Sequence, residues 1–272
     1  MCRMVAIRAS EPVSARGLLV DDVNSLLAQS LGDANGMTHP DGWGLGFYQA
    51  GHREPGVIRS AHSAADDSNF LHTAGHVRST MLVGHVRRAS HGQRRSENSH
   101  PFRQGPWLFA HNGTVTGYER VEPRLRDETP PNLLAAREGQ TDSELLFLWL
   151  LGRMRQTGIG SPVDSEGLET LTGLVRQATL DVAAWCREAT GQPEQDASAA
   201  AFNFVLTDGR ILLASRWNRS LHWTLRETAV EGRTATSFVV ASEPIGGGQW
   251  NEIAEQGILT IEGDLTPHLH SF

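Results

Sequence analysis

The segment Cys2-Arg3-Met4-Val5-Ala6-Ile7-Arg8-Ala9 opens the chain with a mostly apolar run that contains the β-branched residues Val5 and Ile7. Such a run predicts a short β-strand that begins almost at the terminus. The first residue of this strand is the cysteine Cys2.

A cysteine at position 2 can be a nucleophile. A small side chain after the initiator methionine allows an aminopeptidase to remove Met1, which we expect here. Cys2 would then carry a free α-amine, with a pKa near ~7.7–8.0, beside its own thiol, with a pKa near ~8.5. The amine could take the thiol proton, so one residue would supply both nucleophile and general base. Taken alone, Cys2 is equally compatible with an ordinary residue at a frayed terminus.

The remaining sequence predicts one α+β domain over residues 1–272. Residues 119–139 are polar and proline-rich and predict a long loop, and residues 189–199 predict a linker. Thr141 and Glu144 form a capping-box pattern before an apolar run, which predicts the start of a helix. Strands followed by two helices and then by strands predict sheets with helices layered against them. The predicted helices are 22–31, 141–154 and 168–185, and the further strands are 81–87, 106–111, 202–206, 211–215, 219–225, 236–242 and 257–262.

Composition narrows the classes of partner. The 272 residues carry a formal net charge of −7, which is a poor match to nucleic acid or to an anionic membrane and favours a small polar substrate. No segment approaches the roughly 20 apolar residues that span a bilayer, and we expect a cytoplasmic protein with reduced thiols. Cys186 is predicted to be a buried structural thiol. The spacings of the histidines 85, 91, 100 and 111 match no zinc motif, so we expect neither a metal nor another cofactor.

Five short motifs follow Cys2 in a fixed order. They are Asp41-Gly42-Trp43-Gly44, His85-Val86-Arg87-Arg88-Ala89-Ser90, Asn98-Ser99-His100-Pro101-Phe102, His111-Asn112-Gly113 and Thr141-Asp142-Ser143-Glu144. With Cys2, this order resembles the class II glutamine amidotransferases. It is most similar to their stand-alone members, a group that includes the γ-glutamyl hydrolase of ergothioneine biosynthesis and a glutathione-degrading amidotransferase subunit. The resemblance covers residues 2–144, and Ala241-Ser242-Glu243-Pro244 extends it.

The resemblance implies a fold and a nucleophile. The family fold is a four-layer αββα sandwich, the N-terminal-nucleophile hydrolase fold, in which two antiparallel sheets lie between helical layers. Cys2 would attack the γ-amide carbonyl and form a γ-glutamyl thioester. The Asn112 side-chain amide and the Gly113 N–H would hold the oxyanion, and glycine would leave room for the substrate. Locally, Asn112-Gly113 fits a type I′ hairpin turn equally well.

The same resemblance implies how the amino-acid head of the substrate is bound. Arg87 would bind its α-carboxylate as a fork, and Asp142 would bind its α-ammonium. Ser90 and His91 would line the carboxylate end of the pocket. Without the resemblance, Arg87 would be one of several solvated arginines, and Asp142 a carboxylate favoured by the dipole of a helix first turn.

Three functions agree with these residues. The first is an amidohydrolase that acts on glutamine or on a γ-glutamyl compound and releases glutamate. The second is a glutaminase subunit that supplies ammonia to a separate protein partner, since the chain is too short for a synthase domain. The third is a non-catalytic glutamine- or γ-glutamyl-binding regulatory module. The leaving group and the pathway stay open, because they depend on variable stretches such as 50–70 and 119–139.

Overall fold

Two antiparallel sheets face each other in the computed structural model, which describes residues 2–193 and 200–272. The first sheet has seven strands in the order β11-β9-β10-β1-β4-β2-β3, and the second has six in the order β13-β12-β8-β7-β6-β5. The first sheet consists of β1 (Arg3–Ser14), β2 (Trp43–Phe47), β3 (Gly56–Ser60), β4 (Arg78–Val86), β9 (His222–Val230), β10 (Arg233–Ala241) and β11 (Asn251–Glu252). The second consists of β5 (Phe102–Gln104), β6 (Trp107–Thr114), β7 (Ala201–Thr207), β8 (Leu212–Arg216), β12 (Gly257–Ile261) and β13 (Pro267–Ser271).

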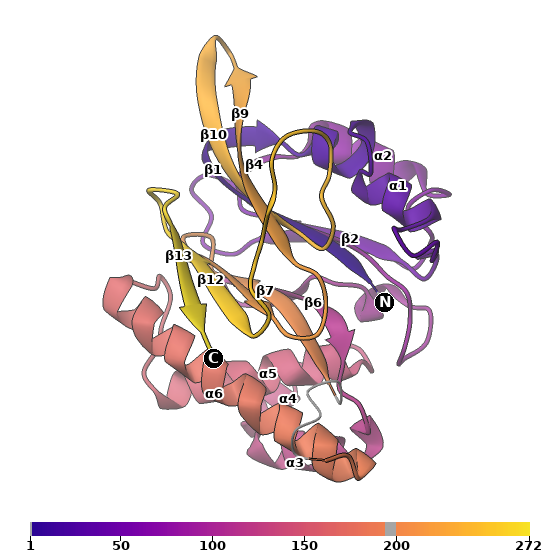
Figure 1. Cartoon of the computed structure of the whole chain (residues 1–272), viewed down its shortest axis with the longest axis vertical. Helices are drawn as coiled ribbons and strands as arrows, with labels where there is room; N and C mark the ends of the chain where they lie inside the picture. The colour runs from indigo at the N-terminus through magenta and orange to yellow at the C-terminus, as the bar shows by residue number, and fades with distance from the viewer. Residues whose placement is uncertain (1, 194–199) are drawn as a thin grey trace.

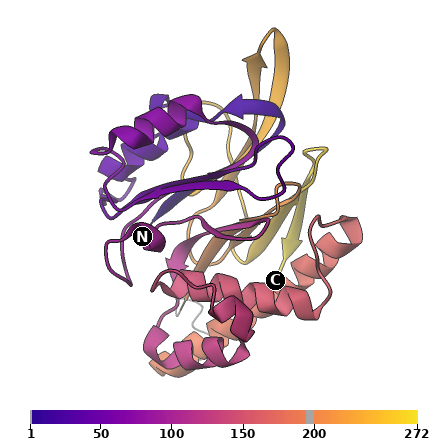
Figure 2. The ribbon, with the colours of Figure 1, turned by 180° about the vertical axis from the view of Figure 1, so that it is seen from behind.

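Helices cover the outer face of each sheet (Figures 1 and 2). The seven-stranded sheet is covered by the short turn η1 (Gly17–Asp21), α1 (Leu26–Leu31) and α2 (Ser68–His76). The six-stranded sheet is covered by α3 (Tyr118–Glu128), α4 (Pro131–Leu134), α5 (Asp142–Gln156) and α6 (Ser165–Thr190), and η2 (Ser96–Asn98) precedes β5. The predicted four-layer αββα sandwich is therefore confirmed. No helix within the described ranges is both long and apolar enough to cross a membrane.

The alternation of side chains along β1 explains how one strand serves two cores. Met4 and Ala6 belong to the core between the two sheets, whereas Val5 and Ile7 belong to the core beneath α1 and α2. Side chains on a strand alternate between its faces, so Cys2 lies on the same face as Met4. The thiol is thus directed into the space between the sheets at one end of the sandwich.

The helix α5 begins as the sequence predicts. The Thr141 hydroxyl accepts the N–H of Glu144, which is the capping bond expected for Thr141. The apolar run 145–151 is buried on every side because α5 is packed between the six-stranded sheet and the helices α3 and α6. The helix predicted at 168–185 is also present, but α6 continues to Thr190 and so includes the start of the predicted linker. Residues 194–199 of that linker lie outside the described residues.

Two predictions from local sequence were wrong. Residues 119–139 are not a long loop, because α3 and α4 occupy most of them; the side chains of Val121 and Leu125 bury one face of α3 despite its polar composition. Asn112-Gly113 is not a hairpin turn, because β6 continues through both residues and pairs them with Asn203 and Phe202 of β7. The strands predicted at 202–206 and 211–215 are present as β7 and β8, which pair antiparallel.

Candidate active site

Cys2 is buried at the end of β1, with about 9% of its surface exposed. Its Sγ accepts the N–H of Arg88 at 3.4 Å and lies 3.4 Å from the Arg88 carbonyl oxygen. Burial raises the pKa of the Cys2 thiol, and the hydrogen bond from Arg88 offsets this only in part. A thiol in this position needs a base beside it to become a thiolate near neutral pH. The expected removal of Met1 concerns a residue outside the described part of the chain.

Arg87 follows β4 directly and is buried beside the same space. Its guanidinium donates to the main-chain carbonyls of His91 at 2.8 Å, Gln93 at 3.2 Å, Gly92 at 3.3 Å and Asp41 at 3.4 Å. These bonds hold the loop after β4 around the arginine. A carboxylate bound by Arg87 would therefore contact the guanidinium N–H groups that do not donate to the loop carbonyls, or it would displace those carbonyls.

Electrostatics link Arg87 to the other charged candidates. Burial lowers the pKa of the Arg87 guanidinium, while negative charge on Cys2, Asp41 and Asp142 acts in the opposite direction. The charge of Asp142 also contributes to the raised pKa of the Cys2 thiol, after the larger effect of burial. Cys2, Arg87 and Asp142 thus lie within electrostatic range of one another, although they come from three separate parts of the sequence.

Asp142 is the first residue of α5 and is fully enclosed. One carboxylate oxygen accepts the N–H of Val115 at 2.8 Å, and the other accepts the N–H of Ser143 at 2.8 Å. The ring nitrogen Nδ1 of His91 lies 3.8 Å from the carboxylate, and the His91 ring packs edge-on against Tyr118. His91 is thereby placed next to Asp142. Ser90 lies on the exposed part of the loop.

Asn112 and Gly113 approach the site from the six-stranded sheet. The Asn112 side chain is buried, and its Nδ2 donates to the Ser242 hydroxyl at 3.3 Å. A Cβ at Gly113 would lie 1.9 Å from the carbonyl oxygen of Ala201 on β7. The requirement for glycine at 113 therefore comes from the close approach of the neighbouring strand, and not only from access for a substrate.

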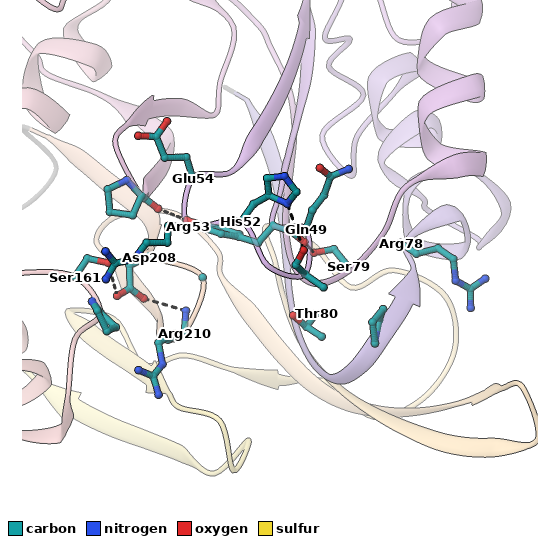
Figure 3. A pocket seen from close by; sticks show the side chains of 16 residues that line it. Gln49, His52, Arg53, Glu54, Arg78, Ser79, Thr80, Ser161, Asp208 and Arg210 are labelled. Atoms are coloured by element: carbon teal, nitrogen blue, oxygen red, sulfur yellow. Dashed lines mark hydrogen bonds between the residues drawn. The ribbon is translucent and has the colours of Figure 1, made fainter.

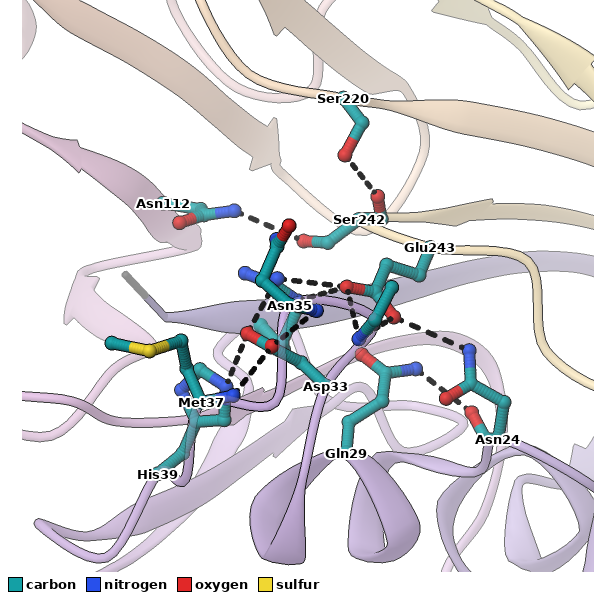
Figure 4. A network of polar contacts seen from close by, with 12 residues as sticks. Asn24, Gln29, Asp33, Asn35, Met37, His39, Asn112, Ser220, Ser242 and Glu243 are labelled. Atoms are coloured by element: carbon teal, nitrogen blue, oxygen red, sulfur yellow. Dashed lines mark hydrogen bonds and ion pairs between the residues drawn. The ribbon is translucent and has the colours of Figure 1, made fainter.

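A buried network of charges, which includes Asp33 and Glu243, was not predicted from the sequence (Figure 4). Arg3 forms ion pairs with Asp33 at 2.6 Å and with Glu243 at 2.7 Å, and its Nη1 donates to the carbonyl oxygen of Cys2 at 2.9 Å. Asp33 also accepts a hydrogen bond from the main chain of Met37 at 2.9 Å. The network fixes the main chain of the nucleophile. The only local signal for this network was the charged residue Arg3 at the start of the apolar run of β1.

Four buried histidines, His39, His85, His100 and His111, lie near this end of the molecule, and burial lowers the pKa of His111 as well. His39 bonds to Asp33 through Nε2 at 3.1 Å, and burial lowers its pKa to about 4. The rings of His85 and His100 have centroids 4.2 Å apart, and burial lowers the pKa of each well below its ordinary value. These side chains are therefore uncharged near neutral pH. Among the described residues, no group of three or more histidine, cysteine or acidic side chains is arranged to hold a metal ion.

A cavity of about 890 Å³ lies away from these residues (Figure 3). It is lined by residues at the start of β4, including Arg78 and Ser79, and by Asp208 and Arg210 of the β7–β8 turn. Cys2 and Arg87 lie at the other end of β4, where Val86 pairs with Arg3. The cavity is separate from the candidate active site.

Comparison with known proteins identifies the family of the chain. A family model described as class II glutamine amidotransferases matches residues 1–237. The chain is 27% identical to the gamma-glutamyl-hercynylcysteine sulfoxide hydrolase of Mycolicibacterium smegmatis over 269 residues, which is 96% of each chain. It is 28% identical to the YafJ protein of Escherichia coli (strain K12) over 196 residues, which is 69% of this chain but 64% of that protein.

Solved structures agree on the fold. A class II glutamine aminotransferase domain protein from Silicibacter pomeroyi superimposes with a TM-score of 0.64 at 22% identity, with 99% of each chain covered. The glutamine phosphoribosylpyrophosphate amidotransferase of Bacillus subtilis gives a TM-score of 0.60 at 14% identity, over 99% of this chain and 49% of that one. At these identities the likeness concerns the fold.

Proposed function

The chain belongs to the class II glutamine amidotransferase family and is an enzyme of the amidohydrolase type, and we propose that it cleaves the γ-amide of glutamine or of a γ-glutamyl compound through a thioester on Cys2. The observation that carries this proposal is the convergence of Cys2, Arg87, Asn112 and Asp142. They come from four separate stretches of sequence: the charges of Cys2 and Asp142 act on Arg87, and Asn112 is joined through Ser242 to Met4, two residues after Cys2. Each matches a position that the family motif predicts.

In the proposed reaction, the α-amine of processed Cys2 takes the proton from Sγ. The thiolate attacks the γ-carbonyl carbon, and the oxyanion accepts hydrogen bonds from Asn112 Nδ2 and the Gly113 N–H. The α-ammonium of Cys2 then gives its proton to the leaving nitrogen as the C–N bond breaks, which leaves a γ-glutamyl thioester on Cys2. Water, deprotonated by the same amine, then attacks the thioester and releases glutamate and the free thiol.

Arg87 and Asp142 supply the binding of the amino-acid head in this proposal. Arg87 would bind the α-carboxylate and Asp142 the α-ammonium. The loop after Arg87 carries Ser90, which is exposed, and His91, whose ring lies beside Asp142. Arg87 and Asp142 recognise the part that glutamine and every γ-glutamyl compound share. The relative that matches over 96% of both chains is named as a γ-glutamyl hydrolase. This name favours a γ-glutamyl compound with a larger leaving group over glutamine itself.

The test is the intact mass of the purified protein after incubation with a diazoketone analogue of glutamine. We expect loss of Met1 and one adduct, which Cys2→Ala abolishes. Cys186→Ala is the matched control: it removes the other buried thiol, which lies in α6, and should leave the adduct unchanged. A retained Met1 without an adduct would support a non-catalytic binding module instead.

Turnover assays then distinguish the hydrolase from the glutaminase subunit. Release of glutamate from γ-glutamyl compounds as well as from glutamine would support the hydrolase. Ammonia release from glutamine alone, stimulated by a separate protein, would support a glutaminase subunit with an ammonia-accepting partner. Both assays use the full chain and follow glutamate and ammonia in parallel.

A further inference from the structure

Ser242 connects the two sheets at the candidate active site (Figure 4). Its hydroxyl oxygen accepts the main-chain N–H of Met4 at 3.1 Å and a hydrogen bond from Asn112 Nδ2 at 3.3 Å. Met4 is on β1, two residues after the nucleophile, whereas Asn112 is on β6 of the other sheet. One hydroxyl therefore links the strand of the nucleophile to the side chain that would stabilise the oxyanion.

The Asn112 amide depends on this single contact. Its Oδ1 is buried and, within the described residues, has no hydrogen-bond partner, so Ser242 is the side chain that fixes the rotation of the amide. An amide nitrogen has two hydrogens. With one of them donated to Ser242, the other is held in a defined direction and is available to an oxyanion.

Ser242 is itself held rigidly. It is about 1% exposed, its N–H donates to the Met4 carbonyl at 3.0 Å, and its own carbonyl accepts the Ser220 hydroxyl at 2.8 Å. The next residue, Glu243, forms the ion pair with Arg3, which binds the carbonyl of Cys2. The segment that orients Asn112 is therefore also fixed relative to the nucleophile.

We propose that Ser242 is a positioning residue that sets the direction of the Asn112 amide for oxyanion binding. This inference rests on the proposed amidohydrolase function. Removal of an oxyanion donor costs roughly 10²- to 10³-fold in kcat. Loss of its orientation, with the donor still present, costs less, and a displacement of a reacting group by about 1 Å costs up to roughly 100-fold.

The experiment is a double-mutant cycle with glutamine as substrate. We expect Ser242→Ala to lower kcat by about 10- to 100-fold with KM changed less than about twofold, since the head of the substrate is bound elsewhere. Because Ser242 acts through Asn112, the variant Asn112→Ala/Ser242→Ala should be no slower than Asn112→Ala alone. Ser242→Cys, which keeps the size of the side chain but accepts hydrogen bonds weakly, should shift kcat in the same direction and serves if the alanine variant does not fold.

Ser237→Ala is the matched control, because Ser237 is buried on β10, the strand that Ser242 follows directly, and its hydroxyl has no partner among the described residues. Its kcat should equal that of the parent protein. An unchanged kcat in Ser242→Ala, or independent and multiplicative losses in the double variant, would overturn the positioning role while leaving the proposed function intact. An inactive parent protein that also lacks the diazoketone adduct would overturn both.

Discussion

Replacement of Arg3 by methionine tests whether the buried charge network stabilises the fold around the nucleophile. Arg3 is about 4% exposed and pairs with two carboxylates, those of Asp33 and Glu243. Methionine fills a similar volume but leaves both carboxylates without a counter-charge. Removing one partner of a buried ion pair typically costs about 3–5 kcal/mol.

The expected loss in the free energy of unfolding is at the lower end of that range. Asp33 keeps the N–H groups of Asn35 and Met37, and Glu243 keeps the N–H of Ala34, so neither carboxylate is left without a donor. We therefore expect a loss of about 3 kcal/mol in the free energy of unfolding at pH 7. With a urea slope of about 3 kcal/mol per molar, the unfolding midpoint would fall by about 1 M.

The pH dependence of the variant gives a second measure. Burial alone would raise the pKa of Asp33, but the N–H of Met37, the charge of Arg3 and the N–H of Asn35 together hold it below its ordinary value. A lowered carboxyl pKa stabilises the folded state above the unfolded pKa, and this contribution is lost as the pH falls through the folded pKa. The difference in stability between the parent and Arg3→Met should accordingly narrow as the pH falls below about 4.

Two further variants complete this test. Arg16→Met removes an arginine whose pair with Asp21 is about half exposed, and it should cost no more than about 1 kcal/mol. Adding Asp33→Asn to Arg3→Met removes one uncompensated charge and should restore part of the loss. A loss below about 1 kcal/mol for Arg3→Met, or no recovery in the double variant, would refute the reasoning.

Three other perturbations have defined outcomes. Asn112→Ala should lower kcat by roughly 10²- to 10³-fold in steady-state assays, and an unchanged kcat would remove it from the oxyanion site. Gly113→Ala should lower the free energy of unfolding in urea titrations by about 3 kcal/mol because its Cβ would meet the main chain of β7, whereas Gly173→Ala, which has open space in α6, should be neutral or stabilising. His39, with a pKa lowered to about 4, binds a proton more readily when unfolded, so stability should fall as the pH is lowered from about 6.5 towards 4. The three other buried histidines, His85, His100 and His111, act in the same direction, and urea midpoints across this pH range that do not fall would contradict their neutral state.

The sequence predicts the elements whose signals are local. The apolar run with β-branched residues at 2–9 indicates β1, and the Thr141 cap marks the first turn of α5. The order of motifs also indicates the family and with it the four-layer fold, which the structure and the family model confirm. The prediction failed at α3, where a polar sequence with an internal proline becomes helical because Val121 and Leu125 are buried against the neighbouring helices.

The candidate site likewise has residues that the sequence predicts and contacts that it does not. Cys2, Arg87, Asn112 and Asp142 are predicted from motifs, and their roles stay predictions until turnover is measured. The contacts that hold them were not predictable, because they join residues far apart in the chain: Arg3 and Glu243 are separated by 240 positions, and Asn112 and Ser242 by 130.

Asn112-Gly113 shows what only the tertiary structure decided. The dipeptide fits a tight turn and an extended strand equally well, since glycine accepts either backbone conformation. Pairing with Asn203 and Phe202 of β7 selects the strand. The sequence by itself predicted, from the order of motifs, that these two residues lie near the nucleophile. The neighbouring strand, through hydrogen bonds that close only when the chain is folded, determined the backbone conformation in which they are held.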